Sequence, residues 1–132
     1  MSKTVLYVED NEFNRKIVRH LLARTTYRLI EAMDGEAGVA TAREARPDLV
    51  IMDIQLPKLS GLEATRQLAA APETRSIPII VITSFALAGD EQKAKEAGAA
   101  AYLAKPYSPR ELLGMIRDAR ARRRKAPAQA AA

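Results

Sequence analysis

The chain has 132 residues, 48% of them hydrophobic, which suits one domain with a proper core and excludes two ordinary domains. The absence of cysteine excludes a disulfide framework, and no apolar run approaches the roughly 20 residues of a membrane helix. The net charge of +5 comes from the segment after residue 109, whereas the first 109 residues are balanced, so the charge argues little for nucleic-acid binding. We expect a cytoplasmic protein without a membrane or nucleic-acid partner.

The N-terminal half alternates between short apolar runs and helical patterns. Residues 4–8 predict a buried strand, and residues 27–32 form a weaker run whose charges suit a sheet edge. The helix between them should bury one face at 3.6-residue spacing, with Arg15 on the opposite, polar face. A second helix is expected over residues 34–46. The expected apolar face of the first helix consists of Phe13, Ile17, Val18, Leu21 and Leu22.

The C-terminal part continues the alternation. Serine–x–x–glutamate capping boxes at Ser60 and Ser108 mark the starts of two helices. We expect one domain over residues 1–125 and a disordered tail at 126–132. The remaining elements are a strand at 49–53, a helix at 60–71, a strand at 77–82, a helix at 88–97, a strand at 100–104 and a helix from Pro109 into the basic residues 120–125.

Strands that alternate regularly with helices predict an α/β fold. Crossovers of this length between apolar strands give a doubly wound, five-stranded parallel sheet with helices on both faces. The carboxyl ends of such strands share one edge of the sheet, and ligands bind at that edge. The residues that follow the strands are therefore the candidates for a functional site.

Polar side chains of complementary chemistry follow four of the predicted strands. Taken singly, each has an ordinary explanation: Asp53 as a turn former, Asp10 as a helix cap, Lys105 as a solvated side chain. Independent accidents of this kind would not gather at one edge, so the set favours a site. Its members are the carboxylates of Glu9, Asp10 and Asp53, the hydroxyl of Thr83 and the ammonium of Lys105.

The charges of this set indicate what it binds. Three carboxylates within a few ångströms repel one another, and one keeps a proton unless cations join them. Lys105 offsets one charge, and a divalent cation would offset the other two. Oxygen ligands favour a hard ion such as Mg²⁺, and a neutralised pocket with open metal positions can accept a phosphoryl group. Asp53 would then be the nucleophile, with Lys105 and Thr83 meeting the phosphoryl oxygens.

The strand-end motifs occur in a specific order over about residues 3 to 120. They are Val8-Glu9-Asp10-Asn11, Met52-Asp53-Ile54-Gln55-Leu56-Pro57 with Gly61, Val81-Ile82-Thr83-Ser84 and Tyr102-Leu103-Ala104-Lys105-Pro106. In this order they resemble the receiver domains of two-component response regulators, most closely the stand-alone, CheY-like kind. The resemblance implies the flavodoxin-like (βα)5 fold with strand order 2-1-3-4-5. The sequence departs mildly at Glu9, where many receivers have aspartate.

The resemblance implies a role in phosphoryl transfer for the acidic residues. Asp53 would accept a phosphoryl group from a histidine kinase or a histidine phosphotransfer protein. Mg²⁺ would be bound by the side chains of Asp10 and Asp53 and by the backbone carbonyl of Gln55, while Glu9 would orient a metal-bound water. No enzymatic turnover is expected beyond the domain's own phosphorylation and dephosphorylation.

The resemblance also implies how the signal leaves the site. Thr83 and Tyr102 would be the switch pair, and Lys105–Pro106 would be a cis peptide bond. A downstream protein would read the face formed by the helix at 88–97, the strand at 100–104 and the helix from Pro109, while the first helix and the loop after the strand at 100–104 would dock the kinase. We expect a monomer or a weak dimer. The candidate partner contacts are Leu87, Ala88, Tyr102 and Tyr107.

Three other functions fit parts of the pattern. A pseudo-receiver would have the same fold and never take phosphate, although every site position here is chemically competent. A phosphohydrolase of the haloacid dehalogenase type needs a second acid two residues after the nucleophile, where this chain has Gln55. A flavodoxin-like cofactor module needs a phosphate-binding loop after the first strand, where Glu9 and Asp10 would repel a phosphate.

Overall fold

The computed structural model describes residues 3–84 and 87–123. The predicted tail at 126–132, and the last two residues of the predicted domain, lie outside the described residues. Within the described part, no helix combines the length and the apolar character that a membrane crossing requires.

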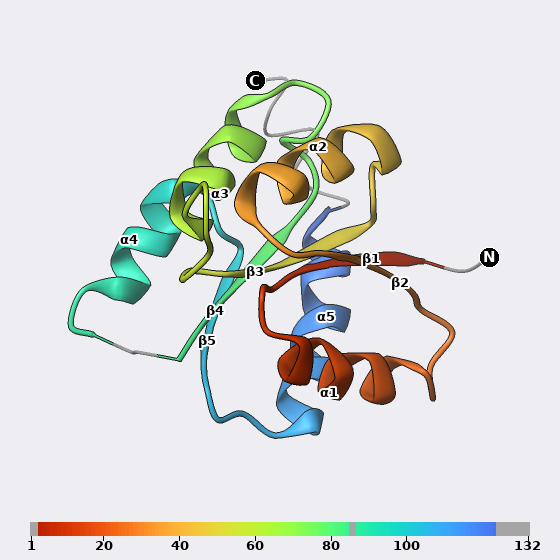
Figure 1. Ribbon diagram of the computed structural model, residues 1–132. Coiled ribbons are helices and arrows are strands. Elements are labelled where there is room, and N and C mark those ends of the chain that lie inside the picture. Colours follow the sequence, from red (N-terminus) through yellow and green to blue (C-terminus); the bar gives the residue numbers. More distant parts are fainter. Residues whose placement is uncertain (1–2, 85–86, 124–132) are drawn as a thin grey trace.

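A single parallel sheet forms the centre of the molecule, with its strands in the order β2-β1-β3-β4-β5 (Figure 1). All four neighbouring pairs are parallel, as the alternation of strands and helices predicted. The doubly wound α/β fold and its strand order are therefore confirmed. The strands are β1 (Thr4–Val8), β2 (Arg28–Ala32), β3 (Leu49–Asp53), β4 (Ile79–Thr83) and β5 (Ala101–Ala104).

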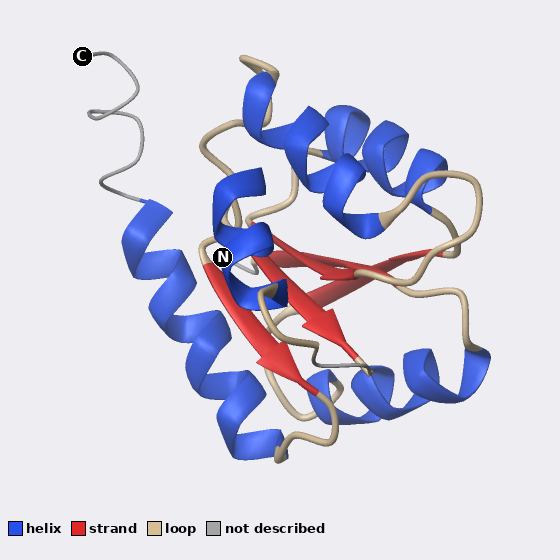
Figure 2. Ribbon diagram, turned by 90° about the vertical axis from the view of Figure 1, so that its left-hand side faces the viewer, coloured by secondary structure: helices blue, strands red, loops and turns tan. Residues whose placement is uncertain are grey.

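Helices cover both faces of this sheet (Figure 2). One apolar core lies between the sheet and α2, α3 and α4, and a second core lies between the sheet and α1 and α5. The helices are α1 (Glu12–Leu22), α2 (Gly35–Ala45), α3 (Gly61–Ala70), α4 (Asp90–Ala97) and α5 (Pro109–Arg123).

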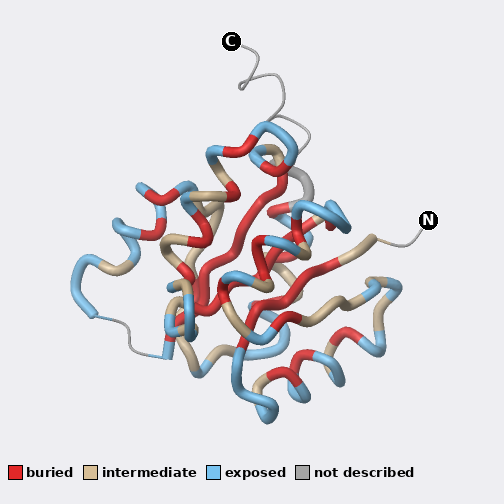
Figure 3. Tube along the Cα trace, turned by 45° about the horizontal axis from the view of Figure 1, so that its top comes forward, coloured by how far each residue is buried: buried red, intermediate tan, exposed pale blue. Residues whose placement is uncertain are grey.

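The two cores explain why the strands read as continuous apolar runs. In β1, Leu6 and Val8 point into the core beneath α2 and α3, whereas Val5 and Tyr7 point into the core beneath α1 and α5. All five residues of β3 and all five of β4 are buried (Figure 3). A polar group at the end of a strand that is buried on both faces is removed from water, unless it projects past the edge of the sheet. Such a group therefore needs hydrogen-bond or ionic partners at that edge.

The orientation of α1 differs from the sequence-based expectation. Phe13 and Ile17, predicted to be buried, are 69% and 46% exposed, whereas Arg15, predicted on the polar face, is only 8% exposed. The buried stripe of α1 is narrow and consists of Arg15, Val18 and Leu22, at spacings of three and four residues. Apolar periodicity misplaced this face because it does not show the hydrogen bond that the Arg15 guanidinium donates to the buried carbonyl of Glu9.

The start of α4 also differs, because the helix begins at Asp90 and not at Ala88. Gly89 takes a left-handed conformation with φ of 87°, which the right-handed helix cannot include. The Asp90 carboxylate accepts a hydrogen bond of 3.0 Å from the Leu87 amide, so residues 87–89 form a turn ahead of the helix.

Gly61 allows α3 to begin directly against the end of β3. Its N–H donates to the carbonyl of Ile54 at 2.9 Å, and a Cβ added to Gly61 would lie 1.8 Å from the backbone oxygen of Asp53. Any side chain at this position must therefore push the helix away from the strand end that carries Asp53. Gly114, on α5, has no atom within 4 Å of such a Cβ.

We expect Gly61→Ala to lower the free energy of unfolding by about 2–3 kcal/mol, because the backbone of β3 cannot yield to the added methyl group. Gly114→Ala is the matched control and should raise stability by about 0.5–1 kcal/mol, since alanine is the better helix former. Urea unfolding of the two variants checks this. Equal stability of Gly61→Ala and the parent protein would contradict the close approach.

Candidate functional site

Lys105 connects two carboxylates at the carboxyl edge of the sheet. Its ammonium lies 2.8 Å from Glu9 Oε1 and 3.3 Å from Asp53 Oδ2. The three residues follow or end β1, β3 and β5, so the parallel sheet brings together positions up to 96 residues apart. The structure thus gathers three of the five residues that the sequence predicted for this edge.

Glu9 is buried and has a donor for each carboxylate oxygen. Oε1 accepts from the hydroxyl of Tyr7 at 3.1 Å and from Lys105, and Oε2 accepts from the amide of Asn11 at 3.2 Å. Burial raises the pKa of Glu9, but hydrogen bonds from Asp53 and Lys105 outweigh it and hold the pKa below its usual value. Glu9 is therefore the ionised partner of Lys105 at neutral pH.

The Tyr7 hydroxyl was missed by the sequence analysis, which treated Tyr7 as part of an apolar strand. The two-residue spacing between Tyr7 and Glu9 could have indicated this contact, because alternate residues of a strand point to the same side of the sheet. The hydroxyl gives a buried tyrosine its polar partner, and burial followed by the charge of Glu9 raises the pKa of Tyr7 well above its usual value.

Asp53 is the less ionised of the two carboxylates. It is 4% exposed, and Oδ1 accepts a hydrogen bond of 3.0 Å from the amide of Gln55. Burial, together with the hydrogen bond and negative charge of Glu9, raises the pKa of Asp53 to about 7, although Lys105 pulls it down. The single ammonium of Lys105 therefore does not supply enough positive charge to keep both carboxylates ionised.

This excess of negative charge is the property that fits a divalent cation. The described residues contain no group of three acidic or histidine side chains close enough to form a ready-made metal site, and Asp10 is exposed at the rim. Mg²⁺ takes one or two carboxylates and fills its other positions with water, so it does not need such a group. The all-oxygen donors at this edge suit Mg²⁺ in that mode.

Thr83 and Tyr102 occupy neighbouring strands next to the site. The Thr83 hydroxyl is buried and lies 3.4 Å from Oε1 of the exposed Gln55 side chain, and the Thr83 carbonyl accepts from the Lys105 amide at 2.8 Å. Tyr102 is paired in register with Val81 and packs against the core beneath α2, α3 and α4. The pair is thus placed between the site and the face of α4 and β5.

The predicted partner contacts differ in how much surface they offer. Leu87 is 70% exposed and Ala88 is exposed in the turn before α4, while Tyr102 and Tyr107 are half-buried. The Lys105–Pro106 peptide bond is cis, the isomer expected from the sequence.

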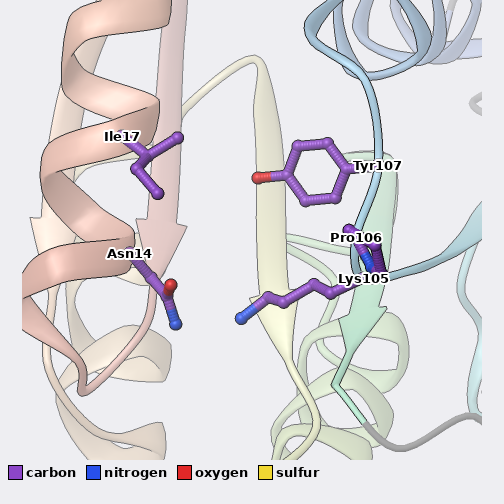
Figure 4. A pocket seen from close by; sticks show the side chains of 5 residues that line it. All are labelled: Asn14, Ile17, Lys105, Pro106 and Tyr107. Atoms are coloured by element: carbon purple, nitrogen blue, oxygen red, sulfur yellow. The ribbon is translucent and has the colours of Figure 1, made fainter.

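The site opens beside α1. A pocket of about 220 Å³ lies between α1 and the loop after β5, and the ammonium of Lys105 points across it toward Asn14 (Figure 4). Ile17 and Tyr107 line this pocket and also a second, adjoining hollow of about 410 Å³ along α1. Lys105 can therefore be approached from the α1 side.

The raised pKa of Asp53 makes the stability of the metal-free protein depend on pH. A protonated Asp53 stabilises the fold fully below about pH 4, the ordinary aspartate pKa, and this contribution is lost as the pH rises through about 7. Asp53→Asn removes the repulsion with Glu9 and should raise the free energy of unfolding at pH 8 by about 1–2 kcal/mol, with a smaller effect at pH 5, where only part of the contribution is lost.

Urea unfolding with a chelator present, at pH 5 and pH 8, measures this difference. Asp118→Asn, an exposed change on α5, is the control and should have no pH-dependent effect. An Asp53→Asn effect of the same size at both pH values would contradict the assignment of the raised pKa.

Comparison with known proteins identifies the family. The family model of the response regulator receiver domain matches residues 5–117. The polar-differentiation response regulators DivK of Brucella anthropi and Brucella ovis are each 44% identical to this chain over 118 residues, covering 89% of this chain and 96% of theirs.

Solved structures show the same likeness. The receiver domain of the sensor histidine kinase PA1611 from Pseudomonas aeruginosa, which has a magnesium ion coordinated in its active-site cleft, is 36% identical with a TM-score of 0.85, covering 92% of this chain and 99% of that one. The chemotaxis protein CheY4 of Vibrio cholerae is 29% identical with a TM-score of 0.83, covering 90% and 99%. From its sequence, its fold and these relatives, the chain belongs to the receiver-domain family of two-component response regulators.

Proposed function

We propose that the protein accepts a phosphoryl group on Asp53 from a phosphohistidine of a histidine kinase or a histidine phosphotransfer protein, with Mg²⁺ as cofactor. The observation that carries this proposal is the shared position of Lys105 between Glu9 and Asp53 at a buried sheet edge. A nucleophilic carboxylate, a cation for the transferred group and an incompletely neutralised charge occur together there.

The metal ligands that we propose are the side chains of Asp10 and Asp53 and the backbone carbonyl of Gln55, with Glu9 binding through a water. The magnesium ion bound in the cleft of the related PA1611 receiver domain supports this assignment. When bound, Mg²⁺ would supply the positive charge that keeps Asp53 ionised and that screens an incoming phosphoryl group.

Transfer itself needs little movement of the protein. A carboxylate oxygen of Asp53 forms the bond to phosphorus while the bond from phosphorus to the donor's imidazole nitrogen breaks, and the electron pair stays on that nitrogen. Lys105 exchanges its contact with Asp53 for the phosphoryl oxygens, whose charge exceeds that of the carboxylate. Gln55 offers no acid for a leaving group, which supports a phosphoacceptor over an enzyme with turnover.

The phosphoryl group then biases a switch between two states. Its charge of about −1.5 to −2 attracts the Thr83 hydroxyl as well as Lys105, and Tyr102 moves into the space that Thr83 leaves. The output surface that we propose is the face of α4, β5 and α5, with contacts from the exposed Leu87 and Ala88. Tyr102 and Tyr107 complete this partner contact.

The donor protein would dock on α1 and the loop after β5. Phe13 and Ile17 are large apolar side chains left exposed there, beside the pocket through which Lys105 is reached. The lack of cysteine fits a reducing compartment, and we propose the cytoplasm, with the protein acting as a monomer or weak dimer.

Incubation with acetyl phosphate and Mg²⁺ should add one phosphoryl group to the protein, detected as a base-labile gain in intact mass. Asp53→Asn should abolish this gain, because an amide is not a nucleophile for phosphorus. Asp118→Asn is the matched control and should be labelled like the parent protein. Full labelling of Asp53→Asn would refute the phosphoacceptor assignment.

Lys105→Ala should separate labelling from signalling. We expect the variant to bind Mg²⁺ and to be labelled. Phosphorylation should no longer alter amide hydrogen exchange in β4 and β5, because the ammonium that is attracted to the phosphoryl group has been removed. Lys16→Ala, an exposed change on α1, should respond to labelling as the parent protein does. If Lys105→Ala shows the same exchange changes as the parent, the proposed coupling is wrong.

A further inference from the structure

Arg15 is a buried arginine with a separate partner for each guanidinium nitrogen. Nη1 donates to the backbone carbonyl of Glu9 at 2.9 Å, Nη2 pairs with Glu12, and Nε lies 3.3 Å from Glu31. These partners belong to the end of β1, the first turn of α1 and the edge strand β2. One side chain thus ties three segments together immediately behind the carboxylate edge of the sheet.

Charge pairing alone does not explain why this arginine is buried. Arg19 pairs with the same two glutamates, at 2.7 Å from Glu31 and 3.7 Å from Glu12, with a side chain that remains 44% exposed. The contact that distinguishes Arg15 from Arg19 is the hydrogen bond to the Glu9 carbonyl. Burial of a guanidinium is costly unless its donors are used, so this bond is part of what holds Arg15 inside.

The Glu9 carbonyl belongs to the peptide that connects the two acidic residues after β1, Glu9 and Asp10. The N–H of Glu9 donates to the carbonyl of Ala32 at 2.9 Å, and its C=O accepts from Arg15, so both backbone groups of Glu9 are fixed. Asp10 is attached through that same peptide and already lies outside the strand. The orientation of the peptide therefore determines how Glu9 and Asp10 present their carboxylates to the site.

We propose that Arg15 is a positioning residue, which fixes the Glu9–Asp10 peptide and thereby orients the acidic side chains for Mg²⁺. This inference rests on the proposed function, because it assigns Arg15 to the same metal site. Lysine is not an equivalent here, since a single ammonium does not reproduce the planar fork that spans three partners.

Three variants separate this role from a general contribution to stability. Arg15→Gln removes the charge and the fork, Arg15→Lys keeps the charge without the fork, and Arg19→Gln removes pairing with the same glutamates without touching Glu9. Mg²⁺ affinity is measured by titration of the unphosphorylated protein, and stability by thermal unfolding with a chelator. Amide hydrogen exchange at Glu9 is measured in the metal-free protein.

Both Arg15 variants should bind Mg²⁺ about tenfold more weakly, the usual effect of removing a partner behind a metal ligand, while Arg19→Gln stays close to the parent protein. Exchange at the Glu9 amide, whose N–H donates to Ala32, should be about tenfold faster in the Arg15 variants alone, because Arg15 no longer holds the carbonyl of the same residue in place. If Arg15→Gln does not fold, Arg15→Lys provides the comparison.

Equal Mg²⁺ affinity and equal Glu9 exchange in Arg15→Gln and Arg19→Gln would overturn the inference and leave Arg15 as an ordinary ion pair. Full recovery of affinity in Arg15→Lys would also overturn it, because charge rather than position would then be responsible. Failure of the proposed function is distinguishable, since it would appear as a parent protein that neither binds Mg²⁺ nor is labelled on Asp53. The exchange measurement tests the positioning of Glu9 even in that case.

Discussion

One ammonium shared between two buried carboxylates determines the charge state of the site at the edge of the sheet. Lys105 is closer to Glu9 than to Asp53, and the pKa of Asp53 is raised while that of Glu9 is lowered. The site is therefore short of positive charge, and a bound cation would favour the ionised form of Asp53 that the proposed phosphoryl transfer requires. Metal binding, ionisation of Asp53 and the position of Lys105 are consequently linked as one equilibrium.

The fold keeps the two carboxylates close together because the backbone on both sides of the edge is held in place. Strands β3 and β4 are buried along their full length, and α3 begins against the carbonyl of Asp53 with only a glycine between them. On the other side, the backbone of Glu9 is held by Ala32 and Arg15. The carboxylates of Glu9 and Asp53 stay near one another because the free energy gained by packing both cores is far larger than the free energy of their repulsion.

The alternation of strands and helices allowed the parallel sheet and the residues of its edge to be predicted from sequence, since parallel strands bring their carboxyl ends together, whereas the strand order came from the resemblance to receiver domains. Partners that depend on tertiary contacts were beyond that pattern. The burial of Arg15 depends on its hydrogen bond to the backbone carbonyl of Glu9, and the role of Tyr7 depends on a hydroxyl within an apolar run. The turn before α4 was missed because alanine-rich sequence favours a helix and the left-handed Gly89 interrupts it.

The narrow buried stripe of α1 has a consequence for how such proteins diverge. Phe13 and Ile17 lie outside both cores, and Ile17 lines the pocket that leads to Lys105, so the two residues can be exchanged without disturbing the packing of the cores. A duplicated copy of the gene is then free to acquire a new upstream partner in a few steps while its reaction centre is inherited intact. With the donor docked on α1 as proposed, recognition and reactivity would be encoded by different residues, which would let related pathways in one cell operate with little crosstalk.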